Sequence, residues 1–181
     1  MRHLTLLALS SFLALGTGCP GSGLGPLLTN GEEMPDRESD DSWTGNLSDG
    51  SVIDLDWATS GGFACYPGTE TTNFTGAHVF VNDALSANVG DFFARVNPSD
   101  PTVDVSLYVL KLGVDTTEFP PDLPSAVACD TSFDRENNGN PGVSEAAVAQ
   151  GGSNPYRIVV GVAGANDATS GGYEVEVWYG E

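Results

Sequence analysis

The sequence has little positive charge. Six Lys and Arg residues stand against 25 Asp and Glu residues, so the 181-residue chain has a formal net charge of −19. A surface this acidic repels phosphate and lacks the cations whose counterion release drives nucleic-acid binding. The composition therefore argues against nucleic acid as a partner.

Long hydrophobic runs are also missing, because the main apolar stretch covers only residues 4–15. Twelve residues are too few to cross a bilayer core of about 30 Å, which needs roughly 20. The stretch follows Arg2 and ends on small residues before Cys19, which predicts a signal peptide over residues 1–18. The end of this segment resembles the bacterial lipoprotein signal, although Gly16 stands where that signal usually has Leu. In that family the Cys, here Cys19, is acylated and becomes the mature N-terminus.

Lipidation of Cys19 predicts an exported protein anchored to the bacterial cell envelope, at the outer membrane or the periplasmic face. The alternative is an ordinary secretory signal in which Cys19 carries no lipid. Residues 19–49 are rich in Gly, Pro, Ser and acidic residues and show no periodic pattern. Such a segment buries too little apolar surface to offset its ordering entropy. We therefore expect a disordered acidic linker over residues 19–49 and a folded domain over residues 50–181.

The domain has the composition of a turn-rich β protein, with 23 Gly and 11 Pro in the chain and only 17% charged residues. Alternation is clearest near the C-terminus, where Tyr173, Val175 and Val177 share one face of a strand and Glu174 and Glu176 the other. We expect an all-β fold, an antiparallel, jelly-roll-like β-sandwich of about seven to eight strands. The predicted strands are Val52–Trp57, His78–Val81, Asp91–Asn97, Val103–Lys111, Ser144–Ala149, Tyr156–Val162 and Tyr173–Tyr179.

Cysteine is scarce, with three residues in the chain. If Cys19 carries lipid, Cys65 and Cys129 form an even pair in an exported protein, and a disulfide between them is the simplest account. It would close a loop of about 65 residues, which the chain-entropy model values at about 4 kcal/mol. A metal site or a reactive thiol is the alternative, but two thiols alone do not complete a metal site and no basic neighbour lowers their pKa.

Residues that carry catalysis are few. His3 lies in the predicted signal peptide, so His78 is the one His of the mature chain, and we expect it on a strand face rather than in a catalytic role. The chain has no GxSxG, Walker loop, HExxH or strand-associated GxGxxG. We therefore expect no enzymatic activity. A small secreted hydrolase that uses paired carboxylates is the alternative.

One acidic loop approximates the spacing of an EF-hand calcium loop. Oxygen side chains of Asp134, Glu136 and Asn138 stand at positions one, three and five, Gly139 at six and Glu145 at twelve. Against this, Glu136 is longer than the usual Asp or Asn, and neither flank has a helical pattern. The alternative is an Asn-Gly turn between two strands.

The order of several short motifs resembles the bacterial pre-peptidase C-terminal domain, over about residues 49–181. The matching segments are Phe74–Phe80, Asp104–Leu110, Gly142–Glu145, Tyr156–Val160 and Gly172–Val177. The resemblance implies a β-sandwich accessory module without catalytic activity, which in some members is stabilised by calcium. It also implies Asp104 and Glu145 as candidate calcium ligands. No peptidase domain accompanies the module in this sequence.

We therefore expect a lipoprotein that displays one such sandwich as a binding or structural module, with the membrane as one partner and an unknown protein or polysaccharide as ligand. Calcium is the one cofactor that the sequence suggests. A carbohydrate-binding jelly roll is a further alternative, with Trp43, Trp57 or Trp178 as stacking platforms.

Overall fold

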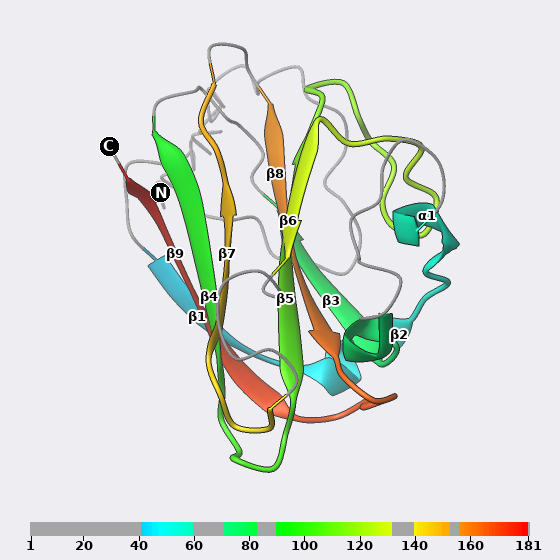
Figure 1. Ribbon diagram of the computed structural model, residues 1–181, viewed down its shortest axis with the longest axis vertical. Helices are drawn as coiled ribbons and strands as arrows, with labels where there is room; N and C mark the ends of the chain where they lie inside the picture. Colours follow the sequence, from blue (N-terminus) through cyan, green and yellow to red (C-terminus); the bar gives the residue numbers. More distant parts are fainter. Residues whose placement is uncertain (1–40, 60–70, 83–89, 132–139, 153–155, 181) are drawn as a thin grey trace, which may run out of the picture.

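The computed structural model describes residues 41–59, 71–82, 90–131, 140–152 and 156–180, and strands make up most of this part of the chain (Figure 1). Its strands are β1 (Asp41–Asn46), β2 (Ser51–Val52), β3 (Ala77–Asn82), β4 (Asp91–Pro98), β5 (Val105–Leu112), β6 (Ala128–Thr131), β7 (Glu145–Ala149), β8 (Arg157–Gly164) and β9 (Gly172–Gly180). Its helical segments are η1 (Leu47–Asp49), α1 (Asp56–Thr59) and η2 (Thr71–Phe74). None of the described helices is long and apolar enough to cross a membrane.

The strands form two antiparallel sheets. The four-stranded sheet has the order β1-β9-β4-β7, and the five-stranded sheet has the order β2-β3-β8-β5-β6. From β3 onward nearly every connection takes the chain from one sheet to the other, which is the topology of a jelly roll. The expected all-β sandwich is confirmed, with nine described strands in place of seven to eight.

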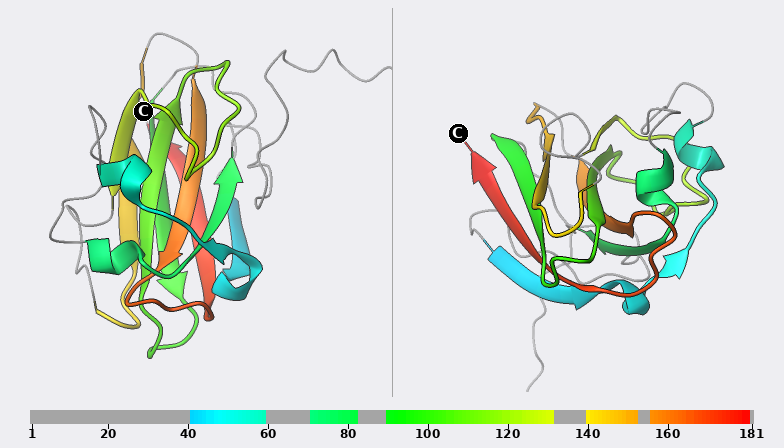
Figure 2. Two further views of the ribbon diagram at one scale, coloured as in Figure 1. Left: turned by 90° about the vertical axis from the view of Figure 1, so that its right-hand side faces the viewer. Right: turned by 60° about the horizontal axis from the view of Figure 1, so that its bottom comes forward.

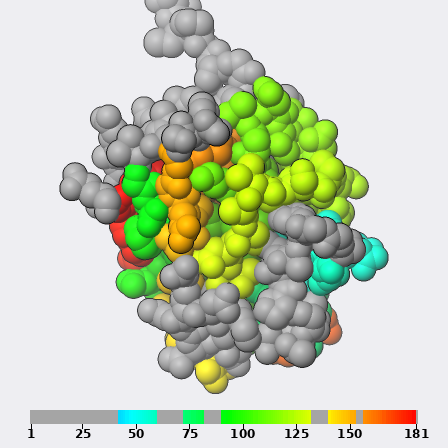
Figure 3. Space-filling view, turned by 45° about the horizontal axis from the view of Figure 1, so that its top comes forward, coloured from blue at the N-terminus to red at the C-terminus, as the bar shows by residue number. Residues whose placement is uncertain are grey.

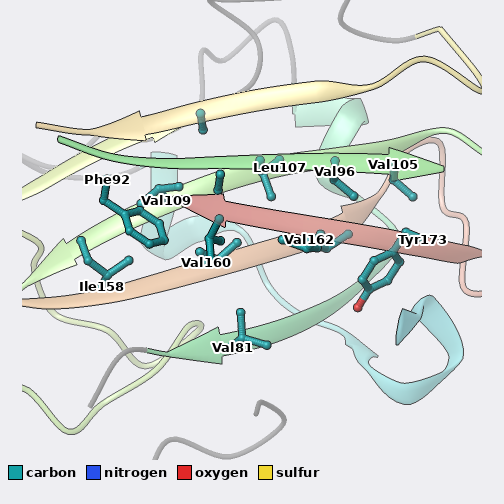
Figure 4. Close-up of a cluster of buried hydrophobic side chains, with 14 of the residues drawn as sticks. Val81, Phe92, Val96, Val105, Leu107, Val109, Ile158, Val160, Val162 and Tyr173 are labelled. Atoms are coloured by element: carbon teal, nitrogen blue, oxygen red, sulfur yellow. The ribbon is translucent and has the colours of Figure 1, made fainter. Parts of the chain in front are cut away.

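The main core lies between the two sheets, whose inner faces meet in Figures 2 and 4. Alternation along β9 produces its half of the contact, because Tyr173, Val175 and Val177 are buried while Glu174 and Glu176 are partly exposed. The partners across the core come from β5 and β8, including Val105, Leu107, Val109, Ile158, Val160 and Val162. The predicted two-faced final strand is therefore confirmed.

The five-stranded sheet is buried on its outer face as well. A second cluster of buried residues covers it, formed by Trp57, Ala58, Phe74, Phe80, Tyr108, Leu110, Leu112, Leu123, Val159 and Ala163. Figure 2 shows α1 and η2 lying over this face. All eight residues of β8 are buried, because this strand has one core on each side. A strand buried on both faces reads as a continuous apolar run, as Ile158–Ala163 does.

Two predictions about the N-terminal part are wrong. The predicted linker over residues 19–49 contains β1 and η1 at residues 41–49, and residues 19–40 lie outside the described part. On the inward side of β1, Trp43 packs against the main core, and Gly45 leaves room for the ring of Tyr173, whose Oη lies 2.6 Å from where a Cβ would be. The apolar group at that position therefore comes from β9, so β1 itself shows no apolar alternation.

The predicted strand Val52–Trp57 is instead the short β2 followed by α1. The side chain of Asp54 accepts a hydrogen bond from the backbone N–H of Asp56 at 2.8 Å, which begins the turn. Trp57 belongs to the second cluster, and Ile53 and Leu55 in the turn before it pack against that cluster. Burial of these residues, rather than sheet pairing, accounts for their alternating pattern.

Candidate functional site

The outer face of the four-stranded sheet differs from that of the five-stranded sheet, because none of the described helices or strands lies over it (Figure 2). Ser42 and Thr44 of β1 are exposed there, and Glu174 and Glu176 of β9 are partly exposed. We call this surface the open face. It is formed by the outward side chains of β1, β9, β4 and β7.

Two aromatic residues stack on each other on the open face, near the end of the sheet where β4 begins and β9 ends. Phe93 of β4 is directly opposite Trp178 of β9 in the antiparallel register. Their ring centroids are 5.4 Å apart, with 6° between the ring planes. The ring of Phe93 also lies over Gly180, where a Cβ would be 2.7 Å from Phe93 Cε2. A glycine at this position therefore leaves room for the ring of Phe93 to stack against Trp178, so that each ring covers part of the other's face.

Arg95 extends this aromatic pair. Its Cζ lies 5.7 Å from the centroid of the Trp178 ring, within the range of a cation–π contact. In the register Arg95 is opposite Glu176, while its Nε is buried without a hydrogen-bond partner in the described structure. The other two described cations are committed elsewhere, because Arg157 is fully buried and Lys111 contacts the ring of Tyr156. Arg95 is thus the one described cation on the open face.

The structure separates the three tryptophans that the sequence offered as stacking platforms. Trp43 faces inward against the main core, and Trp57 is 8% exposed within the second cluster. Only Trp178 lies on the open face. Its neighbours Phe93 and Arg95 were missed in the sequence, although both are outward positions of the predicted strand Asp91–Asn97. The missing information was the register that sets β4 against β9.

His78 is fully buried and engaged at both ring nitrogens. Its Nε2 lies 2.7 Å from the carbonyl oxygen of Phe74, and its Nδ1 lies 2.8 Å from Tyr108 Oη. A carbonyl only accepts, so Nε2 carries the proton of the neutral ring and Nδ1 accepts from the Tyr108 hydroxyl. Burial lowers the His78 pKa from 6.5 to about 4, while the bond to Phe74 opposes this shift. The expected position on a strand face is confirmed, and this ring has no nitrogen left for proton transfer to a substrate.

Asp104, just before β5, and Ser106 on β5 are two buried polar residues. Asp104 is 7% exposed, and both of its carboxylate oxygens are buried without a hydrogen-bond partner in the described structure. The same holds for the hydroxyl of the fully buried Ser106. Burial raises the pKa of Asp104. An unpaired carboxyl in this position favours its protonated form.

The predicted calcium ligands do not meet in the described structure. Asp134, Glu136 and Asn138 lie outside the described residues. Glu145 is 1% exposed and starts β7 on the side of the inward Ala147 and Ala149, between the two sheets. Asp104 is flanked by Val103 and Val105, which face that same core, and so points to the opposite side of the five-stranded sheet. The residues that the structure describes contain no group of three or more His, Cys, Asp or Glu suited to a metal, and calcium binding by the loop stays a prediction.

A small pocket marks the seam where β7 approaches β5 and β6 (Figure 3). Its volume is about 220 Å³, and it is lined by Val109, Ala128, Cys129, Asp130, Val148, Ala149 and Gln150. Asp130 Oδ2 accepts a hydrogen bond from the backbone N–H of Val148 at 2.7 Å, and Lys111 Nζ donates to the carbonyl of Gln150 at 3.0 Å. These side chains form hydrogen bonds with backbone groups at the edge of β7, which leaves fewer of those groups free to pair with another strand. The pocket is smaller than the roughly 300–1,000 Å³ of typical small-molecule sites.

One of the three cysteines, Cys129, lies among the described residues. Cys129 lies on β6, opposite Leu110 of β5, and takes part in a disulfide bond. Cys19 and Cys65 lie outside the described residues. The pairing of Cys129 with Cys65 therefore stays a prediction.

Comparison with known proteins gives no relative for this chain. A scan against protein-family models, a search of curated proteins and a search of solved structures each found no match.

Proposed function

We propose that this chain is a non-catalytic binding module, displayed on the bacterial cell envelope by a lipid on Cys19, and that its ligand binds the open face. The observation that carries the proposal is the difference between the two sheets. The five-stranded sheet hides its outer face under a second hydrophobic cluster, whereas the four-stranded sheet carries a partly exposed, stacked aromatic pair on its outer face. Clustered apolar groups left on a surface mark interaction sites.

The chemistry of the buried polar groups supports binding rather than hydrolysis. A general base must reach its substrate and titrate near the working pH. His78 is fully buried and its pKa is about 4. Asp104 is buried on the far side of the five-stranded sheet from Glu145, so these two acids form no catalytic pair. The order of motifs that resembles the pre-peptidase C-terminal family supports the same accessory role.

Two measurements on the full chain test this proposal. Replacing the acylated residue by Cys19→Ser should move the protein from the membrane fraction to the soluble fraction. The released protein should then cosediment with purified envelopes of the producing cells at micromolar concentration. A Cys19→Ser protein that stays in the membrane fraction after detergent-free washing would contradict the lipid anchor. A soluble variant that does not cosediment with envelopes would contradict the binding role.

A further inference from the structure

We infer that His78 is a pH-sensitive latch for η2. The neutral ring holds η2 against the outer face of the five-stranded sheet, and protonation of the ring releases η2 while both sheets stay folded. The released state exposes part of the second hydrophobic cluster to solvent. The latch lies on the covered sheet, so its behaviour is independent of the ligand proposed for the open face.

The ring of His78 connects three elements of the fold. His78 lies on β3, and its Nε2 is 2.7 Å from the carbonyl oxygen of Phe74, the last residue of η2. Its Nδ1 is 2.8 Å from Tyr108 Oη on β5. The Tyr108 ring meets the ring of Phe74 edge-on, with centroids 6.0 Å apart and 74° between the planes. The rings of His78 and Tyr108 therefore join η2 to the sheet beneath it (Figure 2).

The segment η2 is a small unit that can move separately from the sheets. It has four residues and belongs to neither sheet, so lifting it breaks no strand pairing. Besides the bond between Phe74 and His78, the carbonyl of Thr72 accepts from the backbone N–H of Asn166 at 2.8 Å. Short segments with few attachments open at a lower free energy than the whole domain. Loss of the His78 bond therefore favours local opening of η2 before global unfolding.

Protonation of the ring weakens this attachment. The neutral ring donates from Nε2 to Phe74 and accepts at Nδ1 from the Tyr108 hydroxyl, so both nitrogens are used. A proton on Nδ1 sets two donors against each other and places a positive charge where solvent has no access. Burial lowers the pKa of His78 from 6.5 to about 4. Lifting η2 lets water reach the ring and restores the higher pKa, so protonation favours the open state.

The charged groups around the ring do not offset the charge of a protonated His78. Neither β2, β3 nor η2 has another titratable side chain. Burial is the main cause of the lowered pKa of His78, opposed by the bond to Phe74, and no described acid contributes. Asp104 is itself buried, which raises its pKa and makes it a weaker source of negative charge in acid. The titratable side chains on the other elements of this face are Asp56 of α1, Asp104 before β5, Tyr108 and Lys111 of β5, Arg157 of β8 and Asp167 after β8.

Amide hydrogen exchange of the full chain in detergent, followed by NMR and corrected for the intrinsic effect of pH, measures the opening. The reporter is the N–H of Asn166, which bonds to Thr72 of η2, and the reference is the N–H of Val160 on the central strand β8. From pH 7 to 4.5 the protection of Asn166 should fall about fiftyfold, with about sevenfold of this between pH 6 and 5. At every pH it should stay at least about tenfold below that of Val160, because η2 opens without the sheet.

The control variant is His78→Gln, which keeps an amide donor and acceptor but does not titrate. Its Asn166 protection should change less than about twofold between pH 6 and 5, where carboxylates of ordinary pKa stay ionised. Three outcomes would overturn the inference: no fall in the native chain, an equal fall in His78→Gln, or equal protection of Asn166 and Val160. If His78→Gln does not fold, the native chain decides, through its fall between pH 6 and 5 and the difference between the two amides.

Discussion

The stability of this domain should depend on the protonation of His78. The ring accepts from Tyr108 and donates to Phe74 with no exposure to solvent. A proton on Nδ1 would oppose the hydroxyl proton of Tyr108 and place a charge in the second cluster. The perturbation is therefore acidification, compared between the native chain and His78→Gln, which carries an amide donor and acceptor but does not titrate.

The magnitude follows from the difference between the folded and unfolded pKa. Burial lowers the folded pKa from 6.5 to about 4, so below pH 6.5 the unfolded chain takes up the proton before the folded chain does. The stabilisation is complete above pH 6.5 and is lost as the pH falls towards 4. At 1.36 kcal/mol per pKa unit, the loss attributable to His78 is about 3 kcal/mol. This is a large part of the 5–15 kcal/mol by which domains are typically stable.

Urea unfolding followed by tryptophan fluorescence at pH 7.0, 6.0, 5.0 and 4.5 measures this loss, with the midpoint and slope fitted at each pH. At pH 7, His78→Gln should be less stable than the native chain by about 1–3 kcal/mol, because the amide satisfies the buried partners less well. The two stabilities should converge as the pH falls. If the difference between them stays constant from pH 7 to 4.5, His78 does not titrate as its burial requires, and the reasoning is refuted.

Three further predictions concern other buried groups. Asp104→Asn should raise the free energy of unfolding at pH 7 by about 1 kcal/mol. Burial raises the pKa of Asp104, so the stability that this carboxyl contributes is lost as the pH rises through its folded pKa. A loss of stability in urea unfolding would show that the carboxylate has an essential partner. Gly161→Ala should lower the melting temperature, at a cost of about 2 kcal/mol, because the added Cβ would collide with the ring of Tyr108; an unchanged melting curve would contradict that packing. Non-reducing peptide mapping by mass spectrometry should find Cys65 joined to Cys129, and a free Cys65 thiol in freshly isolated protein would exclude this pairing.

The sequence located most of the strands because a strand that faces one core carries its pattern locally. On β9 the buried and partly exposed residues alternate as the apolar and acidic residues do. The fully buried β8 was found for a related reason, since a short apolar run beside Gly and Asn predicts a strand. β1 was missed because Tyr173 of β9 fills the space over Gly45, so the apolar residue stands on another strand. β6 was missed because only four residues form it and only one of them, Thr131, is buried.

The candidate site was less accessible to prediction. Three tryptophans looked equivalent in the sequence, and only their place in the fold distinguishes them. Trp43 faces the main core, Trp57 lies in the second cluster and Trp178 lies on the open face. Which face of a sheet is covered depends on segments far away in the chain, here α1 and η2 over the five-stranded sheet.

The sequence by itself therefore determined the secondary-structure class and the sandwich, because strand alternation and turn residues act over a few neighbouring positions. Only the tertiary structure decided which outer face is covered, that Phe93 and Arg95 join Trp178, and that Asp104 and Glu145 lie on opposite sides of a sheet. These outcomes depend on strand order and register, which bring together residues as far apart as 93 and 178. Such pairings are fixed by the packing of the whole domain, and no local pattern in the chain encodes them.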